Sequence, residues 1–177
     1  MAANGIEPAK ENPAEFPIAG GVALKQLPQG WRFSEPKFYH KGTAKQYNPP
    51  NDGSCAICMQ YETMRDKFKP AIKRLMLAPA HALDEKELAE LIGFIPNYKD
   101  KSEFALHSAS TKDLAGKRVL IVEGKNIAIN KKFYWLYVSD PDVGFGTYTK
   151  IWFVATAEAW ERHKEEAIKS IHSIEFR

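Results

Sequence analysis

The stretch KRVLIVEGKNIAINKKFYWLYVSDPDVGFGTYTKIWFVAT, residues 117–156, decides the fold. It holds three runs rich in Val, Ile, Phe, Tyr and Trp, at 117–123, 132–139 and 149–156, and these runs predict strands. Short turn-forming segments that contain Gly, Asn, Asp and Pro separate the runs. Connections this short join antiparallel neighbours. The centre of the predicted fold is therefore an antiparallel sheet.

Apolar residues occupy consecutive rather than alternate positions in these runs, for example at 119–122 and 133–136. Strands with this pattern usually have both faces covered. One covering element follows directly, because 157–170 has the pattern of an amphipathic helix with Thr156 as its cap. A last strand is expected at 173–176. The predicted class is α+β, an antiparallel β-sheet flanked by helices.

Shorter elements are predicted in the middle of the chain. A capping-box pattern at 84–87 predicts a short helix that ends at Gly93. Residues 71–78, bracketed by two prolines, fit another short helix. The alternation over 55–62 favours a strand, with a helix capped by Ser54 as the alternative.

The amino-terminal part is rich in proline and small residues. Residues 1–20 predict a flexible arm, followed by a single domain over 21–177. A short strand and a Pro-Gly turn are expected within 21–31, with Trp31 as an anchor. Residues 34–53 have the composition of a loop-rich segment, and the path of the chain up to residue 80 is not fixed by its pattern.

Composition excludes several classes of protein. The 177 residues are 44% hydrophobic and 27% charged, which is typical of a globular domain and not of a disordered or collagen-like chain. The net charge of +3 is far from the concentrated basic charge of a dedicated nucleic-acid binder. No run of apolar residues is long enough to cross a bilayer, and no leader is visible at residues 1–17. We expect a cytoplasmic protein that contacts no membrane.

Two stretches carry a resemblance to a known family. One is ALKQLPQGW at 23–31, and the other runs from 116 to 155 and continues through the helix into SIHSIEF at 170–176. Together they resemble the bacterial members of the PsbP/DcrB family. The resemblance implies an α/β/α sandwich with a PsbP-like fold.

The same resemblance implies binding rather than chemistry. Members of the family include an extrinsic photosystem II subunit, a transport factor that binds the Ran GTPase, envelope lipoproteins, and adaptor chaperones of secreted toxins. These members share no set of catalytic residues that would predict catalytic positions in this sequence, and a fold alone does not determine a function. The absence of a visible leader favours an adaptor-like or immunity-like protein over an envelope lipoprotein.

Cys55 and Cys58 have the spacing of a redox motif or of half a zinc site. The alternative is a pair of buried thiols on a strand, where positions three apart point to opposite faces and cannot form a disulfide. No second cysteine pair completes a four-thiolate site. We therefore predict no metal and no cofactor. The acidic loop at 140–146 fits a hairpin turn better than a calcium site, and its glycines with Lys150 make a poor phosphate loop.

Surplus aromatic residues suggest a binding surface. Aromatic side chains are 12% of the chain, and rings of this kind are typical anchors of partner interfaces. The candidate binding residues are Trp31, Tyr39, Tyr134, Trp152 and Trp160.

Basic residues and aromatics occur together at 131–137, as they do in sheets that bind single-stranded nucleic acid. The low net charge makes a core strand the better interpretation. No residue set dictates a reaction. The leading hypothesis is a non-enzymatic module that recognises another polypeptide. The alternatives are a small-molecule-binding protein, with a pocket between the sheet and 34–53, and a thiol-redox protein that uses Cys55 and Cys58.

Overall fold

The computed structural model describes residues 21–34, 44–139 and 146–176. Its elements in chain order are β1 (Val22–Leu24), β2 (Arg32–Ser34), β3 (Ala44–Asn48), β4 (Cys55–Thr63), the 3-10 turn η2 (Asp66–Phe68), α1 (Lys69–Leu77), α2 (Glu85–Glu90), β5 (Phe104–Leu114), β6 (Lys117–Asn126), β7 (Lys131–Ser139), β8 (Thr147–Ala155), α3 (Ala157–His172) and β9 (Ile174–Phe176).

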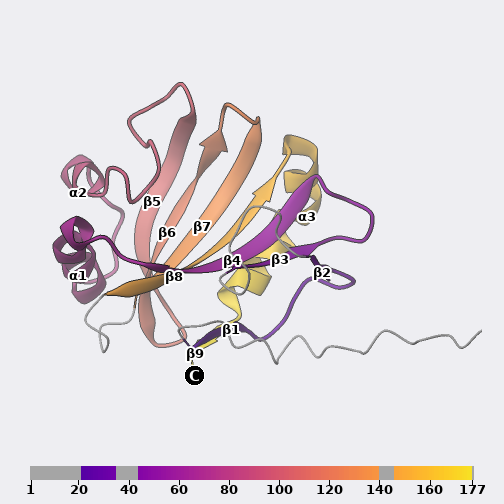
Figure 1. Ribbon diagram of the computed structural model, residues 1–177, viewed down its shortest axis with the longest axis horizontal. Helices are drawn as coiled ribbons and strands as arrows, with labels where there is room; N and C mark the ends of the chain where they lie inside the picture. The colour runs from indigo at the N-terminus through magenta and orange to yellow at the C-terminus, as the bar shows by residue number, and fades with distance from the viewer. Residues whose placement is uncertain (1–20, 35–43, 140–145, 177) are drawn as a thin grey trace, which may run out of the picture.

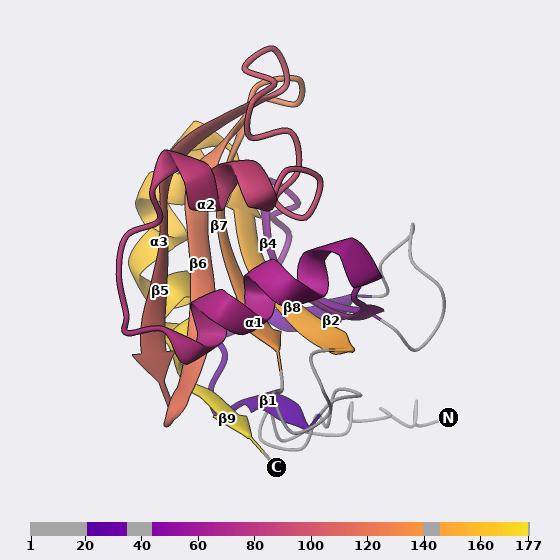
Figure 2. The ribbon, with the colours of Figure 1, turned by 90° about the vertical axis from the view of Figure 1, so that its left-hand side faces the viewer.

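Seven strands form one antiparallel sheet in the order β2-β3-β4-β8-β7-β6-β5, and β1 pairs with β9 in a separate two-stranded sheet. Helix α3 lies on one face of the large sheet, and α1 and α2 lie on the other (Figures 1 and 2). The α+β class and the flanking of the sheet by helices on both faces are thus confirmed.

Each face of the sheet has its own hydrophobic core. Strand β7 shows how consecutive apolar residues serve both cores. Leu136 and Val138 belong to the core under α3, whereas Phe133, Trp135 and Tyr137 belong to the core under α1 and α2. Because side chains alternate between faces along a strand, a central strand needs apolar residues at every position.

The two predicted helix caps are confirmed by their hydrogen bonds. The Thr156 hydroxyl accepts from the backbone N–H of Ala159 at 3.3 Å and begins α3. The Asp84 carboxylate accepts from the Glu87 N–H at 2.8 Å, and the Glu87 carboxylate accepts from the Asp84 N–H at 3.0 Å. Gly93 follows α2 with a φ of +82°, a conformation that favours glycine.

The prediction was incomplete at the edges of the sheet. Strand β4 is confirmed over the helical alternative, but β2 and β5 were not predicted. Strand β3 lies within the segment 34–53 that the sequence indicated as loop-rich. β5 lies at one edge of the sheet, and its central residues His107 and Ser108 are exposed. An exposed edge strand lacks the apolar pattern that marks a central one.

Several sequence-based expectations fall on residues that the structure does not describe. These are the arm at 1–20, Tyr39 and most of the predicted turn at 140–146. Trp31 is described and is buried, with its ring 6.3 Å from that of Phe153, which confirms its role as an anchor. In the described ranges no helix is both long enough and apolar enough to pass through a bilayer.

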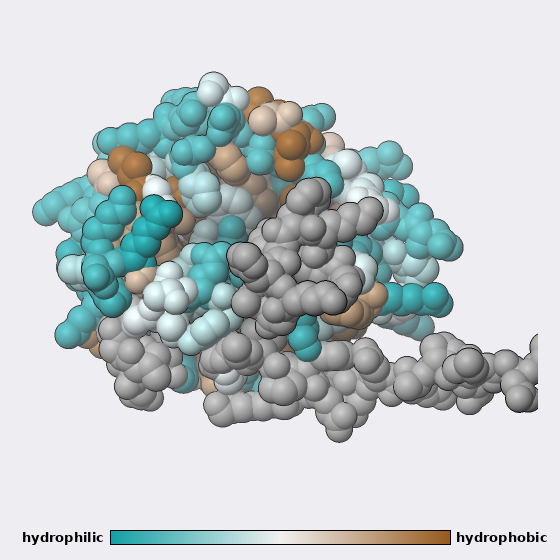
Figure 3. Space-filling view, in the orientation of Figure 1, coloured by the Kyte–Doolittle hydropathy of each residue, from teal (hydrophilic) through white to brown (hydrophobic). Residues whose placement is uncertain are grey.

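The face of the molecule in Figure 3 is mostly hydrophilic, with apolar side chains in separate patches. Five large apolar residues of the described chain are well exposed, and two of them lie in the turn between β6 and β7. They are Phe33, Leu77, Ile92, Ile127 and Ile129.

Candidate functional site

A polar pocket opens on the sheet face that α1 and α2 cover. Its volume is about 240 Å³, and its walls come from the end of β4, from β7 and β8, from η2, and from the segment after α2. Five of its lining residues have a charge or a hydroxyl on a long side chain, and these are Glu62, Arg65, Tyr137, Tyr148 and Lys150. A small concave site with converging polar groups is the usual form of a ligand site.

The strand period brings these groups together. Tyr148, Lys150 and Trp152 are two residues apart on β8, so their side chains lie on one face of the sheet. In the antiparallel register Lys150 is directly opposite Tyr137 of β7, and Tyr148 is directly opposite Glu62 of β4. The pocket is therefore a consequence of pairing between three neighbouring strands.

The ammonium of Lys150 lies in a box of aromatic rings. Its Nζ atom is 4.0 Å from the ring centroid of Trp135, 5.0 Å from that of Trp152 and 5.6 Å from that of Tyr137. Burial lowers the pKa of Lys150 to about 8, although the negative charge of Glu62 acts in the opposite direction. The aromatic faces attract the cation and offset part of its lost hydration.

Within the described chain, no ion pair joins Lys150 to a carboxylate. The carboxylate of Glu62 instead accepts a hydrogen bond from the Tyr148 hydroxyl. The Tyr137 hydroxyl is buried and has no hydrogen-bond partner among the described residues. Burial raises the pKa of Tyr137 well above its ordinary value, so its hydroxyl keeps its proton and can donate. Among the described residues, the pocket thus holds a cation without an ion pair and a donor without an acceptor.

Aromatic rings form the rest of the wall. The Phe94 ring lies 5.0 Å from that of Tyr137, 5.1 Å from that of Tyr148 and 5.7 Å from that of Phe68. Gly93 directs the chain into this position, because its left-handed backbone follows the short helix α2. The lining therefore combines charged groups with flat aromatic rings.

The two cysteines do not form a redox pair in this structure. Both lie on β4 as buried free thiols, Cys55 in the core under α3 and Cys58 in the core under α1 and α2. Burial raises the pKa of Cys55 to about 11 and that of Cys58 to about 12. Reactive thiols have lowered pKa values, so this arrangement does not support the thiol-redox alternative.

The structure places four of the five aromatic candidates inside the protein. Trp31, Tyr134, Trp152 and Trp160 are at most 8% exposed, because the sheet is covered on both faces. Their rings pack in the two cores, and a part of these residues in binding stays a prediction. The Trp152 ring forms one wall of the box around Lys150.

Comparison with known proteins identifies the architecture. No family model matches the sequence, and no curated protein matches it. Among solved structures, the chain is similar to CyanoP, the PsbP of the cyanobacterium Synechocystis, with a TM-score of 0.53 and 10% identity over 89% of this chain and 88% of that one. The chain has a PsbP-like fold.

A protein of unknown function from Pseudomonas aeruginosa is also similar, with a TM-score of 0.50 and 8% identity over 83% of this chain and 97% of that one. The PsbP-like fold implied by the sequence resemblance is thus confirmed. Identities of 8% and 10% show the architecture alone. The role of the Lys150 pocket within this PsbP-like fold has to be argued from the pocket itself.

Sequence reasoning missed the central residues of this pocket. Lys150 was weighed only as part of a phosphate loop, and Tyr137 only as part of a basic and aromatic strand. A signal was present, because Lys150 is a lone charge within a run of strand-forming residues, TYTKIWF at 147–153. In a PsbP-like sheet with both faces covered, such a lysine has to be buried.

Proposed function

We propose that this protein is a binding module whose Lys150 pocket holds a small organic anion. The observation that carries the proposal is the pairing of the half-buried ammonium of Lys150, which has no ion pair in the described chain, with the unpartnered hydroxyl of Tyr137. A buried polar group without a partner is costly. An anion that accepts hydrogen bonds from both groups removes that cost.

The charge balance of the lining favours an anion over a cation. Two lining residues are basic, Arg65 and Lys150, and one is acidic, Glu62, which leaves one net positive charge. Glu62 is also already engaged by Tyr148. A carboxylate is the simplest group that accepts hydrogen bonds from an ammonium and a hydroxyl together.

Size and shape restrict the ligand further. The volume of about 240 Å³ lies below the range of about 300–1,000 Å³ that suits drug-sized ligands. The rings of Phe68 and Phe94 offer flat apolar surface beside the charged end. A compact carboxylate with an apolar or aromatic body fits these properties, and benzoate is a suitable probe.

Titration calorimetry with benzoate, isobutyrate and phosphate tests the proposal. We expect benzoate and isobutyrate to bind the intact protein. Lys150→Met and Tyr137→Phe should each weaken this binding by about tenfold or more, as expected for a lost charge-assisted or buried hydrogen bond. Lys164→Met and Tyr134→Phe are matched controls. Lys164 also lies over a tryptophan ring, 5.3 Å from that of Trp160, and Tyr134 is buried on the opposite face of the sheet. Equal binding by all four variants would overturn the proposal.

Polypeptide recognition, the leading hypothesis from sequence, is a second candidate. A shallow groove of about 660 Å³ beside α3 supports it, because Ile168 contributes apolar surface there. The positive charges of Lys164 and Lys169 outnumber the one negative charge, that of Glu165. The proposed partner is a segment with apolar and acidic side chains. Location in the cytoplasm of a bacterium stays a prediction.

Photo-crosslinking tests this second candidate. A crosslinker in place of Ile168 is expected to capture an acidic, apolar peptide that a crosslinker in place of Lys73 on α1 does not capture. Ile168→Glu should abolish binding of that peptide in solution. Capture of the peptide from both positions, or unchanged binding by Ile168→Glu, would contradict recognition in this groove.

A further inference from the structure

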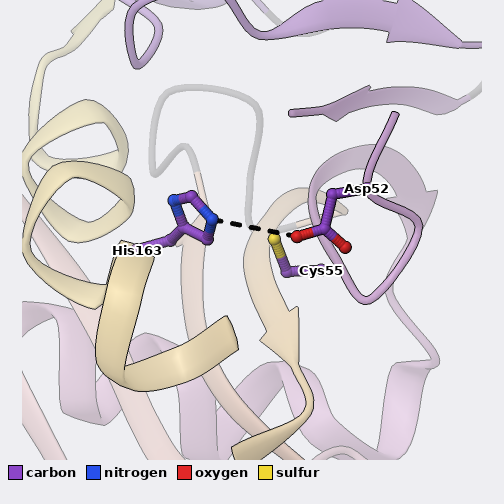
Figure 4. Close-up of side chains that lie close together, drawn as sticks. All are labelled: Asp52, Cys55 and His163. Atoms are coloured by element: carbon purple, nitrogen blue, oxygen red, sulfur yellow. Dashed lines mark ion pairs between the residues drawn. The ribbon is translucent and has the colours of Figure 1, made fainter. Parts of the chain in front are cut away.

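Three side chains with metal-binding atoms meet at the amino-terminal end of β4. Asp52 lies in the turn before the strand, Cys55 is the first residue of the strand, and His163 projects from α3 (Figure 4). One ligand atom from each lies within 4.8 Å of the other two. The Nε2 atom of His163 is 3.9 Å from Oδ2 of Asp52.

Surrounding contacts hold each of the three in place. The backbone N–H of Ser54 donates to Oδ1 of Asp52 at 2.8 Å, and Oδ2 lies toward His163. The N–H of Thr156 donates to the Ser54 carbonyl at 3.0 Å and ties the turn to the start of α3. Supporting contacts of this kind fix the orientation of ligands in metal sites.

The His163 imidazole has a support of its own. Its ring packs edge-on against Trp31, with centroids 5.8 Å apart and an interplanar angle of 83°. Trp31 is itself buried and anchored on Phe153. The orientation of the imidazole is therefore set by the core under α3 and not by the solvent.

The cluster has a closed inner side and an open outer side. Cys55 is 1% exposed, whereas the side chains of Asp52 and His163 are 25% and 22% exposed. An ion at the centre would rest on the sulfur and face solvent between the other two ligands. Three protein ligands with one open position is the usual arrangement of a zinc ion that also binds water.

We propose that Asp52, Cys55 and His163 bind a zinc ion, with a water molecule as the fourth ligand. A thiolate, an imidazole and a carboxylate are the three ligand classes of zinc, and the sulfur excludes the hard cations Mg²⁺ and Ca²⁺. Ligand atoms of a tetrahedral zinc lie about 3.5 Å apart, so side-chain movements of about 1 Å close the site. On binding, the Cys55 thiol loses its proton to solvent and the S–Zn bond forms.

One cation competes for the site. Arg162 has a guanidinium nitrogen 3.4 Å from Oδ2 of Asp52 and 3.9 Å from the carboxylate of Glu158. Its side chain is 54% exposed, so it can leave Asp52 and keep Glu158 as its partner. Arg162→Gln is therefore expected to tighten zinc binding, since the metal no longer displaces an ion pair.

Cobalt substitution tests the proposal on the full chain. We expect Co²⁺ to bind in a 1:1 ratio with a thiolate-to-cobalt absorption band, and Zn²⁺ to displace it. Cys55→Ser should abolish the band, whereas Cys58→Ser should leave it intact. Cys58 is the matched control, because it is a second buried thiol on the same strand and on the other face.

Two further variants keep the test valid if Cys55→Ser does not fold. Asp52→Asn and His163→Gln change partly exposed side chains. Each is expected to weaken zinc affinity by more than about tenfold, since even the loss of a residue that only hydrogen-bonds to a metal ligand typically weakens affinity by about tenfold or more. The proposal is overturned if saturating Co²⁺ gives no thiolate band, or if the band is lost with Cys58→Ser and kept with Cys55→Ser.

Discussion

Tyr137 and Lys150 are cross-strand partners on β7 and β8, and their polar ends share one buried pocket without an acceptor from the described chain. Each group is expensive to bury alone. The surrounding core contains the aromatic rings of Trp135, Trp152 and Phe94. This pair is therefore the observation on which the proposed anion site rests.

Tyr137→Phe should stabilise the protein while it weakens anion binding. Its hydroxyl has no partner to lose, so its removal should raise the free energy of unfolding by up to about 1 kcal/mol. Tyr134→Phe is the matched control and should destabilise by about 1 kcal/mol, because the Tyr134 hydroxyl is 2.6 Å from Nε2 of His172. Urea unfolding measures both changes. Destabilisation by Tyr137→Phe would show that the hydroxyl has a partner.

The lowered pKa of Lys150 should make stability depend on pH. The folded protein has a Lys150 pKa of about 8, against 10.5 for an ordinary lysine, so the unfolded chain binds more protons between these values. The free energy of unfolding should then rise from pH 8 toward pH 10.5 by up to about 3 kcal/mol from this group. The Lys150→Met variant should lack this increase in the free energy of unfolding. The difference between the pH profiles of the variant and the wild type, measured by urea unfolding, gives the contribution of Lys150. Equal pH profiles would contradict the lowered pKa.

Anion binding should have the opposite pH dependence. The anion requires the ammonium form of Lys150, which is depleted above its pKa of about 8. Benzoate affinity should therefore fall about tenfold for each pH unit well above that value. Calorimetry between pH 7 and pH 9.5 measures this slope. A constant affinity over that range would place the anion elsewhere.

Both cysteines should resist alkylation in the folded protein. Burial raises the pKa of Cys58 to about 12 and removes it from solvent, so little thiolate is available at pH 8. Iodoacetamide labelling followed by mass spectrometry should modify Cys58 only after unfolding in guanidinium. A disulfide between Cys55 and Cys58 would contradict the strand geometry, since the two thiols belong to opposite cores.

Gly124→Ala should be strongly destabilising. A Cβ atom at Gly124 would lie 2.3 Å from the carbonyl oxygen of Ala105 and 2.7 Å from Cζ of Phe133, so backbone of the neighbouring strand has to move. We expect a loss of about 2 kcal/mol or more, as in other overpacked cores. Gly53→Ala is the control, because a Cβ there meets nothing within 4 Å. Thermal unfolding compares the two, and an equal effect of both would contradict the close contact.

Much of the fold could be predicted because its signals are local. The apolar runs that became β6, β7 and β8 indicated a central sheet covered on both faces, and the caps at Thr156 and Asp84 fixed where two helices begin. Strand β5 could not be predicted in the same way. Its pattern is set by exposure at the edge of the sheet, which depends on the neighbours of the strand and not on its own residues.

The sequence by itself determined the α+β class and the antiparallel pairing of the central strands, since periodicity and short connections act between near neighbours in the chain. Only the tertiary structure decided the two candidate sites. Lys150 meets Glu62 through strand register, and Cys55 meets His163 through the packing of α3, across separations of more than eighty residues. Contacts over such distances are set by how whole elements pack, and the spacing of residues along the chain does not record them.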